Sequence, residues 1–328
     1  MTKIFNTLRH FLVVARFIVI QAIQRNIISL KRSWLISPTT QPDACKTIVA
    51  RTYLYPSRIF RPKHVNDTER LPLIIMVHGG GFIMNNPSAD DPLARFLADR
   101  CKILVVNIDY RKAPLNMFPA GYEDVVGSIL ALLDDRDLPI DRSKVFLCGS
   151  SAGGNLVLGA AQDPRLRNKL QGLVALTPVV NFIPTAKEQM ETRPDPTIPD
   201  FLGAMWDGAL EVYVGTTDPI ALRDTRLSPT FFKNRQDLPK HIFMIGCEHD
   251  MLCHEAKLMA EKLIEEDKSQ TSSVERHPNV VWMLVKGQTH GFDHFPQKPA
   301  AKEAKRLKDR ELLYENIAQW FVDTCAKL

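Results

Sequence analysis

Residues 145–154 read VFLCGSSAGG, and this stretch decides the fold that the rest of the chain must form. Its four leading apolar residues are typical of a buried strand. The pattern G-x-S-x-G follows at once, and a segment with the composition of a helix begins at Ala152. A nucleophilic serine needs a tight, strained turn between strand and helix, where small neighbours let backbones pass closely. The stretch therefore predicts Ser151 as a nucleophile, with Gly149 and Gly153 supporting the turn.

A phosphate-binding loop is the main alternative for a run of glycines and serines. That loop requires Lys and then Ser or Thr after its last glycine, whereas Asn155 and Leu156 follow Gly154 in this chain. A helix that begins at Ala152 also leaves its first amide N–H groups free to face developing negative charge. The serine interpretation is therefore favoured, and we expect the Ala152 amide to donate to an oxyanion.

A second glycine motif, His78-Gly79-Gly80-Gly81, follows an apolar, strand-like run. Three glycines after a buried strand let the backbone approach a substrate and aim N–H groups at it, as in the HGGG type of oxyanion hole. We expect the amides of Gly79 and Gly80 to hold the oxyanion, while His78 and Gly81 support the loop. Each such donor stabilises a transition state by on the order of 3 kcal/mol.

A serine alkoxide does not form unaided at neutral pH, so a base and a group that orients it are needed. Two strand-like runs downstream of Ser151 end near suitable residues, Asp250 and His290. We predict that His290 takes the serine proton and returns it to the leaving group, while Asp250 fixes the His290 tautomer. The neighbours that could be mistaken for members of this triad are Glu248, His249 and His294. No set of metal ligands has a recognised spacing, so no metal site is expected.

Short apolar runs rich in Val and Ile alternate with helical patterns along the chain. Because these runs are apolar throughout, they predict a mostly parallel sheet with helices on both faces. The predicted strands are Leu73–Val77, Ile103–Ile108, Val145–Cys148, Leu173–Leu176, Ile242–Gly246 and Val281–Val285, with an earlier strand over residues 48–55. The predicted helices are Pro92–Arg100, Tyr122–Leu133, Ala152–Gln162, Glu255–Glu265 and a long C-terminal one with an apolar stripe of Ala304, Leu307, Leu312 and Ile317 to Phe321.

Two segments interrupt this alternation, residues 1–45 and about 180–238. The second is rich in proline and falls between two predicted strands, so we interpret it as an insertion into a single domain, 46–328. Insertions above the carboxyl ends of strands lie where α/β folds bind ligands. Both segments are therefore predicted to form a cap over the site. Core packing and pocket lining are both expected among the large side chains of the insertion, which are Phe182, Phe201, Met205, Trp206 and Tyr213.

The first 30 residues combine basic and apolar side chains. Arg16 interrupts their apolar run, no small-x-small cleavage site follows, and the uninterrupted run is too short to span a bilayer. We expect a helix that packs on the body as part of the cap, with contact to a membrane surface as the alternative. The residues that keep helical spacing are Ile4, Leu8, Phe11, Leu12 and Ala15.

The C-terminal residues Ala326-Lys327-Leu328 resemble the S-K-L class of peroxisomal import signal, with alanine in place of serine. This ending predicts a peroxisomal location, against a cytoplasmic or a membrane-associated one.

The composition is that of an ordinary globular protein, with 45% hydrophobic and 24% charged residues. The 42 basic and 37 acidic residues give a net charge of +5, and the basic residues are spread along the chain. No nucleic-acid partner is therefore expected. The 6 cysteines include no C-x-x-C pair and are expected to be thiols in a reducing compartment.

Taken together, the motifs resemble the hormone-sensitive-lipase-like family of α/β hydrolases, which includes microbial carboxylesterases, arylacetamide-deacetylase-like enzymes and plant carboxylesterase-like proteins. The resemblance covers about residues 70–295. The chain departs from the family pattern at Ser150, where the family usually has Asp, at Leu115, where it often has Glu, and at Cys253-His254, which replace a more acidic stretch. Besides the motifs above, the resemblance is carried by Asp109–Pro114 (DYRKAP), Phe118-Pro119-Ala120, Glu123-Asp124, Leu227-Ser228-Pro229, Asp250-Met251-Leu252 with Glu255, and His290-Gly291-Phe292.

The resemblance implies an α/β-hydrolase fold and cleavage of the carboxylic ester of a small or medium apolar substrate through an acyl-enzyme, without a cofactor. A place in a secondary-metabolite pathway is one expectation. A peroxisomal acyl-CoA thioesterase is an alternative, as is a cyclase or lyase that uses the same site. A hormone receptor of the gibberellin type is disfavoured, because such receptors lack the histidine found here at position 290. The basic residues considered for the phosphates of CoA are Lys187, Arg193, Arg223 and Arg226.

Overall fold

A computed structural model describes residues 11–23, 40–50, 53–66, 69–270 and 279–328. A sheet of eight strands runs through the described residues in the order β1-β2-β4-β3-β5-β6-β7-β8. The contacts of β1 and β2 are antiparallel, and those among β3 to β8 are parallel, so the predicted mostly parallel sheet is confirmed. The strands are β1 (Ala44–Ala50), β2 (Tyr53–Phe60), β3 (Leu71–Val77), β4 (Leu104–Ile108), β5 (Ile140–Ser150), β6 (Gly172–Leu176), β7 (His241–Cys247) and β8 (Val280–Val285).

The single early strand predicted over residues 48–55 is wrong. The region forms two antiparallel strands, β1 and β2, in which Ile48 is paired with Tyr55. No Gly, Asn or Asp, the residues that mark a tight hairpin, separates the two strands in the sequence. The half-exposed side chains of both strands therefore resemble one continuous strand.

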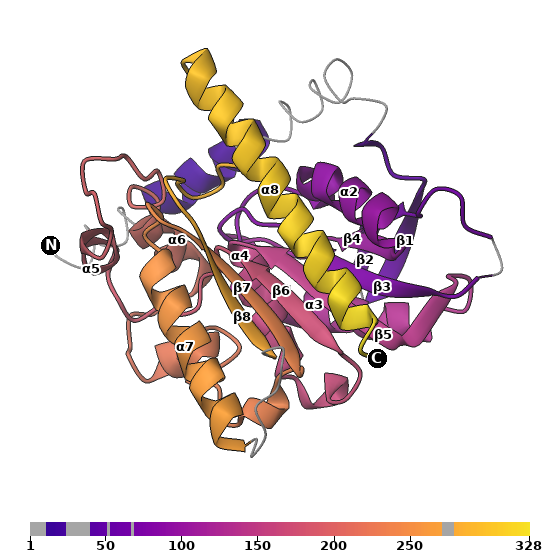
Figure 1. Ribbon diagram of the computed structural model, residues 1–328. Helices are drawn as coiled ribbons and strands as arrows, with labels where there is room; N and C mark the ends of the chain where they lie inside the picture. Colours follow the sequence, from indigo (N-terminus) through magenta and orange to yellow (C-terminus); the bar gives the residue numbers. More distant parts are fainter. Residues whose placement is uncertain (1–10, 24–39, 51–52, 67–68, 271–278) are drawn as a thin grey trace, which may run out of the picture.

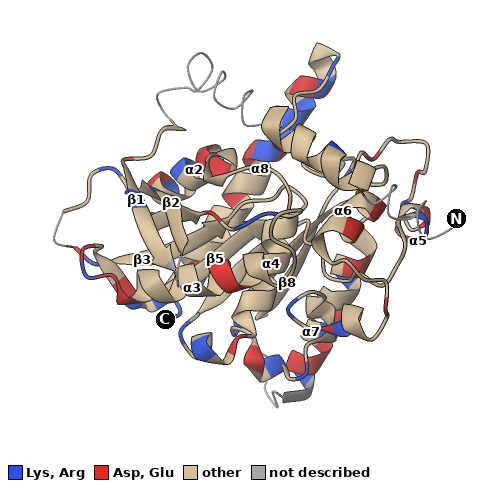
Figure 2. Ribbon diagram, turned by 180° about the vertical axis from the view of Figure 1, so that it is seen from behind, with Lys and Arg blue, Asp and Glu red and all other residues tan. Residues whose placement is uncertain are grey.

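Helices cover both faces of the sheet (Figures 1 and 2). Alternate residues of β3 point to opposite faces, so that Ile74 packs in one apolar cluster and Ile75 in the other. One cluster holds side chains of α2 (Asp91–Cys101) and α8 (Ala300–Cys325). The other holds side chains of α3 (Ala120–Asp134), α4 (Ala152–Ala161) and α7 (Cys253–Gln270). Because β3 to β8 are parallel, their carboxyl ends lie at the same edge of the sheet, where the loops that follow them can meet.

The long C-terminal helix is confirmed as α8, but its predicted apolar stripe is partly wrong. Leu307 is 39% exposed and Leu312 is 62% exposed. Leu312 lies one residue, or about 100° of helical turn, away from the buried Leu313. The helix also continues beyond the sheet, as Figure 1 shows, so its first turns have no sheet to pack against.

The two segments predicted to form a cap touch each other. Residues 11–23 are helical, and Phe17 in this helix is buried. A Cβ at Gly208, in α6 (Trp206–Tyr213) of the insertion, would lie 3.1 Å from the Phe17 ring. Ile4 and Leu8 lie outside the described residues, and the cap role of both segments stays a prediction. So does contact with a membrane surface, although the helix exposes Phe11, Leu12, Val19 and Ile23.

The large side chains of the insertion divide as the sequence suggests. Phe182 and Trp206 are buried and stacked with ring centroids 5.5 Å apart, and Tyr213 is buried as well. Phe201 is 44% exposed, and its ring lies next to that of His290. The insertion also contains α5 (Ala186–Glu191) and lies between β6 and β7.

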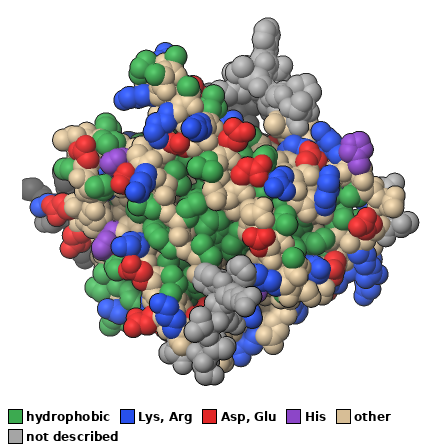
Figure 3. Space-filling model, viewed as in Figure 1, with side chains coloured by type: hydrophobic (Ala, Val, Ile, Leu, Met, Phe, Trp, Pro, Cys, Tyr) green, Lys and Arg blue, Asp and Glu red, His purple; other side chains and the backbone are tan. Residues whose placement is uncertain are grey.

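The surface of the described residues mixes both charge signs. Basic and acidic side chains are interspersed over the face seen in Figure 3, and basic and acidic residues alternate along the ribbon in Figure 2. No helix in the described parts of the chain combines the length and the apolarity needed to cross a membrane. The six cysteines are free thiols, of which Cys148 and Cys247 are buried.

Candidate active site

Ser151 occupies the sharp turn between β5 and α4. Its backbone has φ 54° and ψ −118°, a conformation that residues other than glycine rarely adopt, so the turn is strained. The turn is close-packed, because a Cβ at Gly149 would lie 2.4 Å from the Gly153 carbonyl oxygen. A Cβ at Gly153 would lie only 1.9 Å from the Val77 carbonyl oxygen. Glycine is thus required at both positions that the sequence singled out, and the strain exposes the Ser151 hydroxyl at the end of the central strand.

The structure brings the three predicted triad residues together. His290 Nε2 lies 2.9 Å from Ser151 Oγ, and His290 Nδ1 lies 2.7 Å from Asp250 Oδ2. Asp250 follows β7 and His290 follows β8, so neighbouring parallel strands deliver both side chains to the same edge. The second Asp250 oxygen accepts a hydrogen bond from the Leu252 amide at 2.9 Å. The carboxylate is therefore fixed, and it fixes the imidazole in turn.

The electrostatic setting of His290 suits a general base. Burial lowers the pKa of His290, but the negative charge and the hydrogen bond of Asp250 raise it, and the net pKa lies above the usual 6.5. Asp200 and Asp293 raise the pKa further through their charges. A base of raised pKa binds the proton of the serine more strongly during attack.

The predicted oxyanion loop lies directly beside the serine. A Cβ at Gly79 would lie 3.1 Å from the Ser151 Cβ. Gly80 has φ 125°, and a Cβ there would meet the Met84 carbonyl oxygen at 2.4 Å. Gly81 has φ 60°. Within the described residues, the amides of Gly79, Gly80 and Ala152 have no backbone acceptor. These are the three donors that the sequence proposes for an oxyanion, and they remain available to one.

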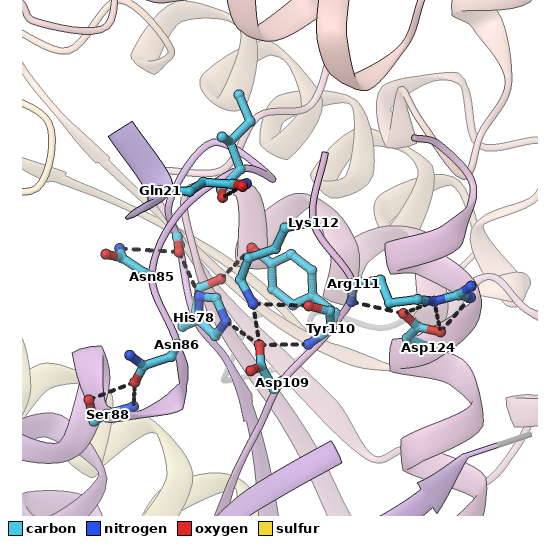
Figure 4. Close-up of polar contacts among 12 residues, drawn as sticks. Gln21, His78, Asn85, Asn86, Ser88, Asp109, Tyr110, Arg111, Lys112 and Asp124 are labelled. Carbon is cyan, nitrogen blue, oxygen red and sulfur yellow. Dashed lines mark hydrogen bonds and ion pairs between the residues drawn. The ribbon is translucent and has the colours of Figure 1, made fainter. Parts of the chain in front are cut away.

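His78 supports this loop rather than joining the triad (Figure 4). Its Nδ1 lies 2.7 Å from the Gly79 carbonyl oxygen and its Nε2 lies 3.0 Å from Asp109 Oδ1. The ring stacks on Tyr110, with centroids 4.6 Å apart. Burial raises the pKa of Asp109, but the His78 hydrogen bond and the Lys112 charge outweigh it and bring the pKa to about 2. The Asp109–Lys112 part of the family motif therefore anchors the oxyanion loop.

The alternatives to the triad lie elsewhere. His294 Nε2 is 3.4 Å from both Asp90 and Asp293, and Glu248 accepts a hydrogen bond from the Gly287 amide. His249 lies 3.8 Å from Glu248. In the part of the chain that the structure describes, no group of three or more His, Cys, Asp or Glu side chains is placed to hold a metal ion.

Two residues of the insertion reach the site: Asp200, which no sequence pattern singled out, and Phe201, one of the large side chains noted in the sequence. Asp200 is buried and its Oδ2 accepts a hydrogen bond from the Met251 amide, next to Asp250, at 2.9 Å. Burial raises the pKa of Asp200, and the charge of Asp250 raises it further. The Phe201 ring meets that of His290 edge to face, with centroids 5.9 Å apart, and it meets Phe295 at 5.6 Å.

A separate cleft of about 520 Å³ opens on the insertion, away from the triad residues. Phe118, Arg223 and Lys233 contribute to its walls. Because none of Ser151, Asp250 and His290 lines this cleft, it plays no part in the geometry above.

Comparison with known proteins agrees with this geometry. A family model described as the alpha/beta hydrolase fold matches residues 74–293. An arylesterase of Saccharolobus solfataricus is 31% identical over 217 residues, which cover 65% of this chain and 68% of that protein. A versiconal hemiacetal acetate esterase of Aspergillus parasiticus is 32% identical over 117 residues, covering 35% of this chain and 36% of that one.

A solved structure is similar over nearly the whole chain. The esterase of Pyrobaculum calidifontis superposes with a TM-score of 0.72 at 26% identity, covering 96% of this chain and 94% of that one. Several curated relatives are matched over a smaller share, 30% to 41% of their own length. The family match covers more than half of the chain, and it includes the serine turn, the glycine loop and both triad partners. The chain therefore belongs to the hormone-sensitive-lipase-like family of α/β hydrolases.

Proposed function

We propose that this protein is a carboxylesterase-type serine hydrolase that forms an acyl-enzyme on Ser151. One observation carries the proposal: the continuous hydrogen-bonded chain from Asp250 through His290 to the hydroxyl of a serine on a strained turn. The names of two similar proteins, an arylesterase and an esterase, support the same reaction class.

The reaction follows from the geometry. Ser151 Oγ attacks the acyl carbon as its proton passes to His290 Nε2, while Asp250 stabilises the imidazolium. The amides of Gly79, Gly80 and Ala152 hold the resulting oxyanion. Collapse of this intermediate breaks the bond to the alcohol oxygen, which takes the proton from His290. Water then repeats the two steps, releasing the carboxylic acid and restoring the serine.

The alcohol part of the substrate is proposed to be apolar. His290 must reach the leaving oxygen, so the group on that oxygen lies on the His290 side of the site. Phe201 and Phe295 stand there, and both are largely exposed, at 44% and 56%. The name of the Aspergillus relative also supports a place in specialised metabolism for this chain.

Two of the four residues proposed to bind CoA phosphates make other polar contacts, which supports the ester over the thioester. Arg193 is buried and donates to backbone carbonyls, including that of Ile198 at 2.7 Å. Arg226 is paired with Asp224 at 2.6 Å. Arg223 lies against the Phe231 ring and lines the separate cleft. The ester is therefore the substrate class that we propose.

Turnover of p-nitrophenyl esters from acetyl to decanoyl, beside acyl-CoA thioesters of the same lengths, tests this function. We expect ester hydrolysis that Ser151→Ala abolishes and that a fluorophosphonate blocks by labelling Ser151. Turnover of the thioesters alone would replace the esterase by the thioesterase. Labelling of Ser151 without hydrolysis of either series would favour the cyclase or lyase, and near-native activity of Ser151→Ala would overturn the triad.

A further inference from the structure

Gln21, in the N-terminal helix, joins two loops that are far apart in the sequence (Figure 4). Its side-chain amide nitrogen donates to the Ile83 carbonyl oxygen at 2.7 Å and to the Ala113 carbonyl oxygen at 2.6 Å. Both acceptor residues are completely buried. An amide nitrogen carries two hydrogens, so Gln21 satisfies both carbonyls at once.

The first of these loops is the one that carries the proposed oxyanion donors. The Gly80 carbonyl oxygen accepts hydrogen bonds from the amides of Ile83 at 3.1 Å and Met84 at 2.8 Å. The second loop is tied to the first, because the Ala113 amide donates to the Phe82 carbonyl oxygen at 3.0 Å. Gln21 thus completes a hydrogen-bonded ring around residues 80–83.

This loop needs support from outside. Gly80, Gly81 and Phe82 all have positive φ, at 125°, 60° and 62°. A run of sparsely populated backbone conformations persists only where the surroundings hold it. Gln21 binds a carbonyl oxygen in each loop, that of Ile83 in this one and that of Ala113 in the other. Neither bond uses the Gly79 and Gly80 amides, which stay free to face the site.

The helix that presents Gln21 is itself held in place. Phe17, one helical turn earlier, is buried against α6, where its ring lies next to Gly208. α6 also contacts the loop directly, because Tyr213 stacks on Phe82 with ring centroids 4.0 Å apart. The helix and α6 therefore fix the loop between them.

We propose that Gln21 is a positioning residue for the oxyanion hole, so that the N-terminal helix serves transition-state stabilisation as well as covering the site. This inference rests on the proposed hydrolysis. Without the Gln21 bonds the substrate still binds, but the Gly79 and Gly80 amides lose their alignment with the oxyanion. The loss falls on kcat and leaves KM nearly unchanged.

Gln21→Leu tests the proposal, with Gln189→Leu as the matched control. Gln189 is a buried glutamine that likewise donates to a carbonyl, that of Pro184 at 3.2 Å, but it lies on α5 of the insertion. Each variant is measured for kcat and KM on a p-nitrophenyl ester and for its thermal unfolding midpoint. Each is also titrated with a trifluoromethyl ketone, whose adduct with Ser151 places an oxyanion between the glycine amides.

We expect Gln21→Leu to lower kcat about tenfold, a fraction of the effect of losing an oxyanion donor outright. KM should change by less than twofold, and trifluoromethyl ketone affinity should fall by the same factor as kcat. Gln189→Leu should leave both quantities unchanged, whatever its effect on the unfolding midpoint. Gln21→Met, which keeps the length of the side chain without a donor, replaces Gln21→Leu if the latter fails to fold.

Unchanged kcat and ketone affinity in Gln21→Leu would overturn the inference, as would a rise in KM alone or equal losses in the Gln189 control. These outcomes differ from failure of the proposed function, which would show as a wild-type protein that neither turns over esters nor binds the ketone.

Discussion

Ser151 and the Gly79–Gly81 loop are shaped by backbone sterics, whereas the N-terminal helix and the insertion reach the same site only through side chains. In the first region a Cβ at Gly153 would lie 1.9 Å from a carbonyl oxygen, so one residue type fits. In the second region Gln21, Asp200 and Phe201 contribute hydrogen bonds or aromatic ring contacts from their side chains. Other side chains could make such contacts from other positions.

This difference separates residues that the fold requires from residues that can vary between proteins of the same fold. A strained turn admits few sequences, so its residues set whether the chemistry occurs. Side-chain contacts from the N-terminal helix and the insertion are replaceable, so we expect them to adjust rate, pH dependence and selectivity. Substitutions at matched positions in the two regions should therefore differ strongly in size.

The largest effect is expected for Asp250→Asn. The substitution removes the charge that stabilises the imidazolium and lets His290 adopt the wrong tautomer, which lowers kcat by about 10⁴-fold in a comparable triad. His290 must be neutral to act, so its raised pKa places the acid limb of wild-type kcat/KM above pH 6.5. Loss of the Asp250 charge lowers that pKa, and the limb of the residual activity should move to lower pH. A rate within tenfold of wild type would contradict the assignment of Asp250.

Gly80→Ala is expected to have the next largest effect. A Cβ there meets the Met84 carbonyl oxygen at 2.4 Å on a backbone with φ 125°, so the loop must shift. Misplacing an oxyanion donor lowers kcat by about 10²- to 10³-fold. Gly208→Ala on α6 is the matched control, because its Cβ meets side chains rather than backbone, with the Phe17 ring nearest at 3.1 Å. Steady-state kinetics should show at most a few-fold loss in this control, and equal losses in the two variants would break the comparison between the regions.

The same division explains which features the sequence predicts. The triad, the glycine loop and the parallel strands carry patterns that sterics and burial impose, and the structure places all of them as expected. The division into β1 and β2 was missed because no Gly, Asn or Asp lies between the two strands in the sequence. Asp200 was missed because a lone aspartate in a proline-rich segment has no pattern that points to Met251, more than 50 positions away along the chain. Contacts of this kind follow only from the three-dimensional path of the insertion.

Asp200→Asn should have a smaller effect, seen in the pH profile more than in the rate. Asp200 raises the pKa of His290 through its charge, after the larger contributions from Asp250. Removing that charge lowers the pKa of His290, so the acid limb of kcat/KM should move to lower pH, and by less than in Asp250→Asn. Asparagine keeps one acceptor for the two amides that Asp200 now binds, those of Met251 and Leu202. A limb that stays in place would show that Asp200 acts only as a structural link.

The smallest effect is expected for Phe201→Leu, and it should appear as selectivity. Leucine keeps an apolar contact but loses the edge-to-face geometry, which contributes about 0.5–1.5 kcal/mol in aromatic pairs. Benzyl acetate and cyclohexylmethyl acetate share an acyl group and differ in the aromaticity of the alcohol. We expect the substitution to reduce the benzyl-to-cyclohexylmethyl ratio of kcat/KM by roughly two- to tenfold, while ethyl acetate turnover stays the same. Ile220→Leu, at an exposed apolar residue of the insertion that lines the separate cleft, is the control and should leave the ratio unchanged. If Phe201→Leu lowers kcat/KM equally for all three esters, Phe201 positions His290 rather than the alcohol group. The insertion then contributes to the chemistry itself.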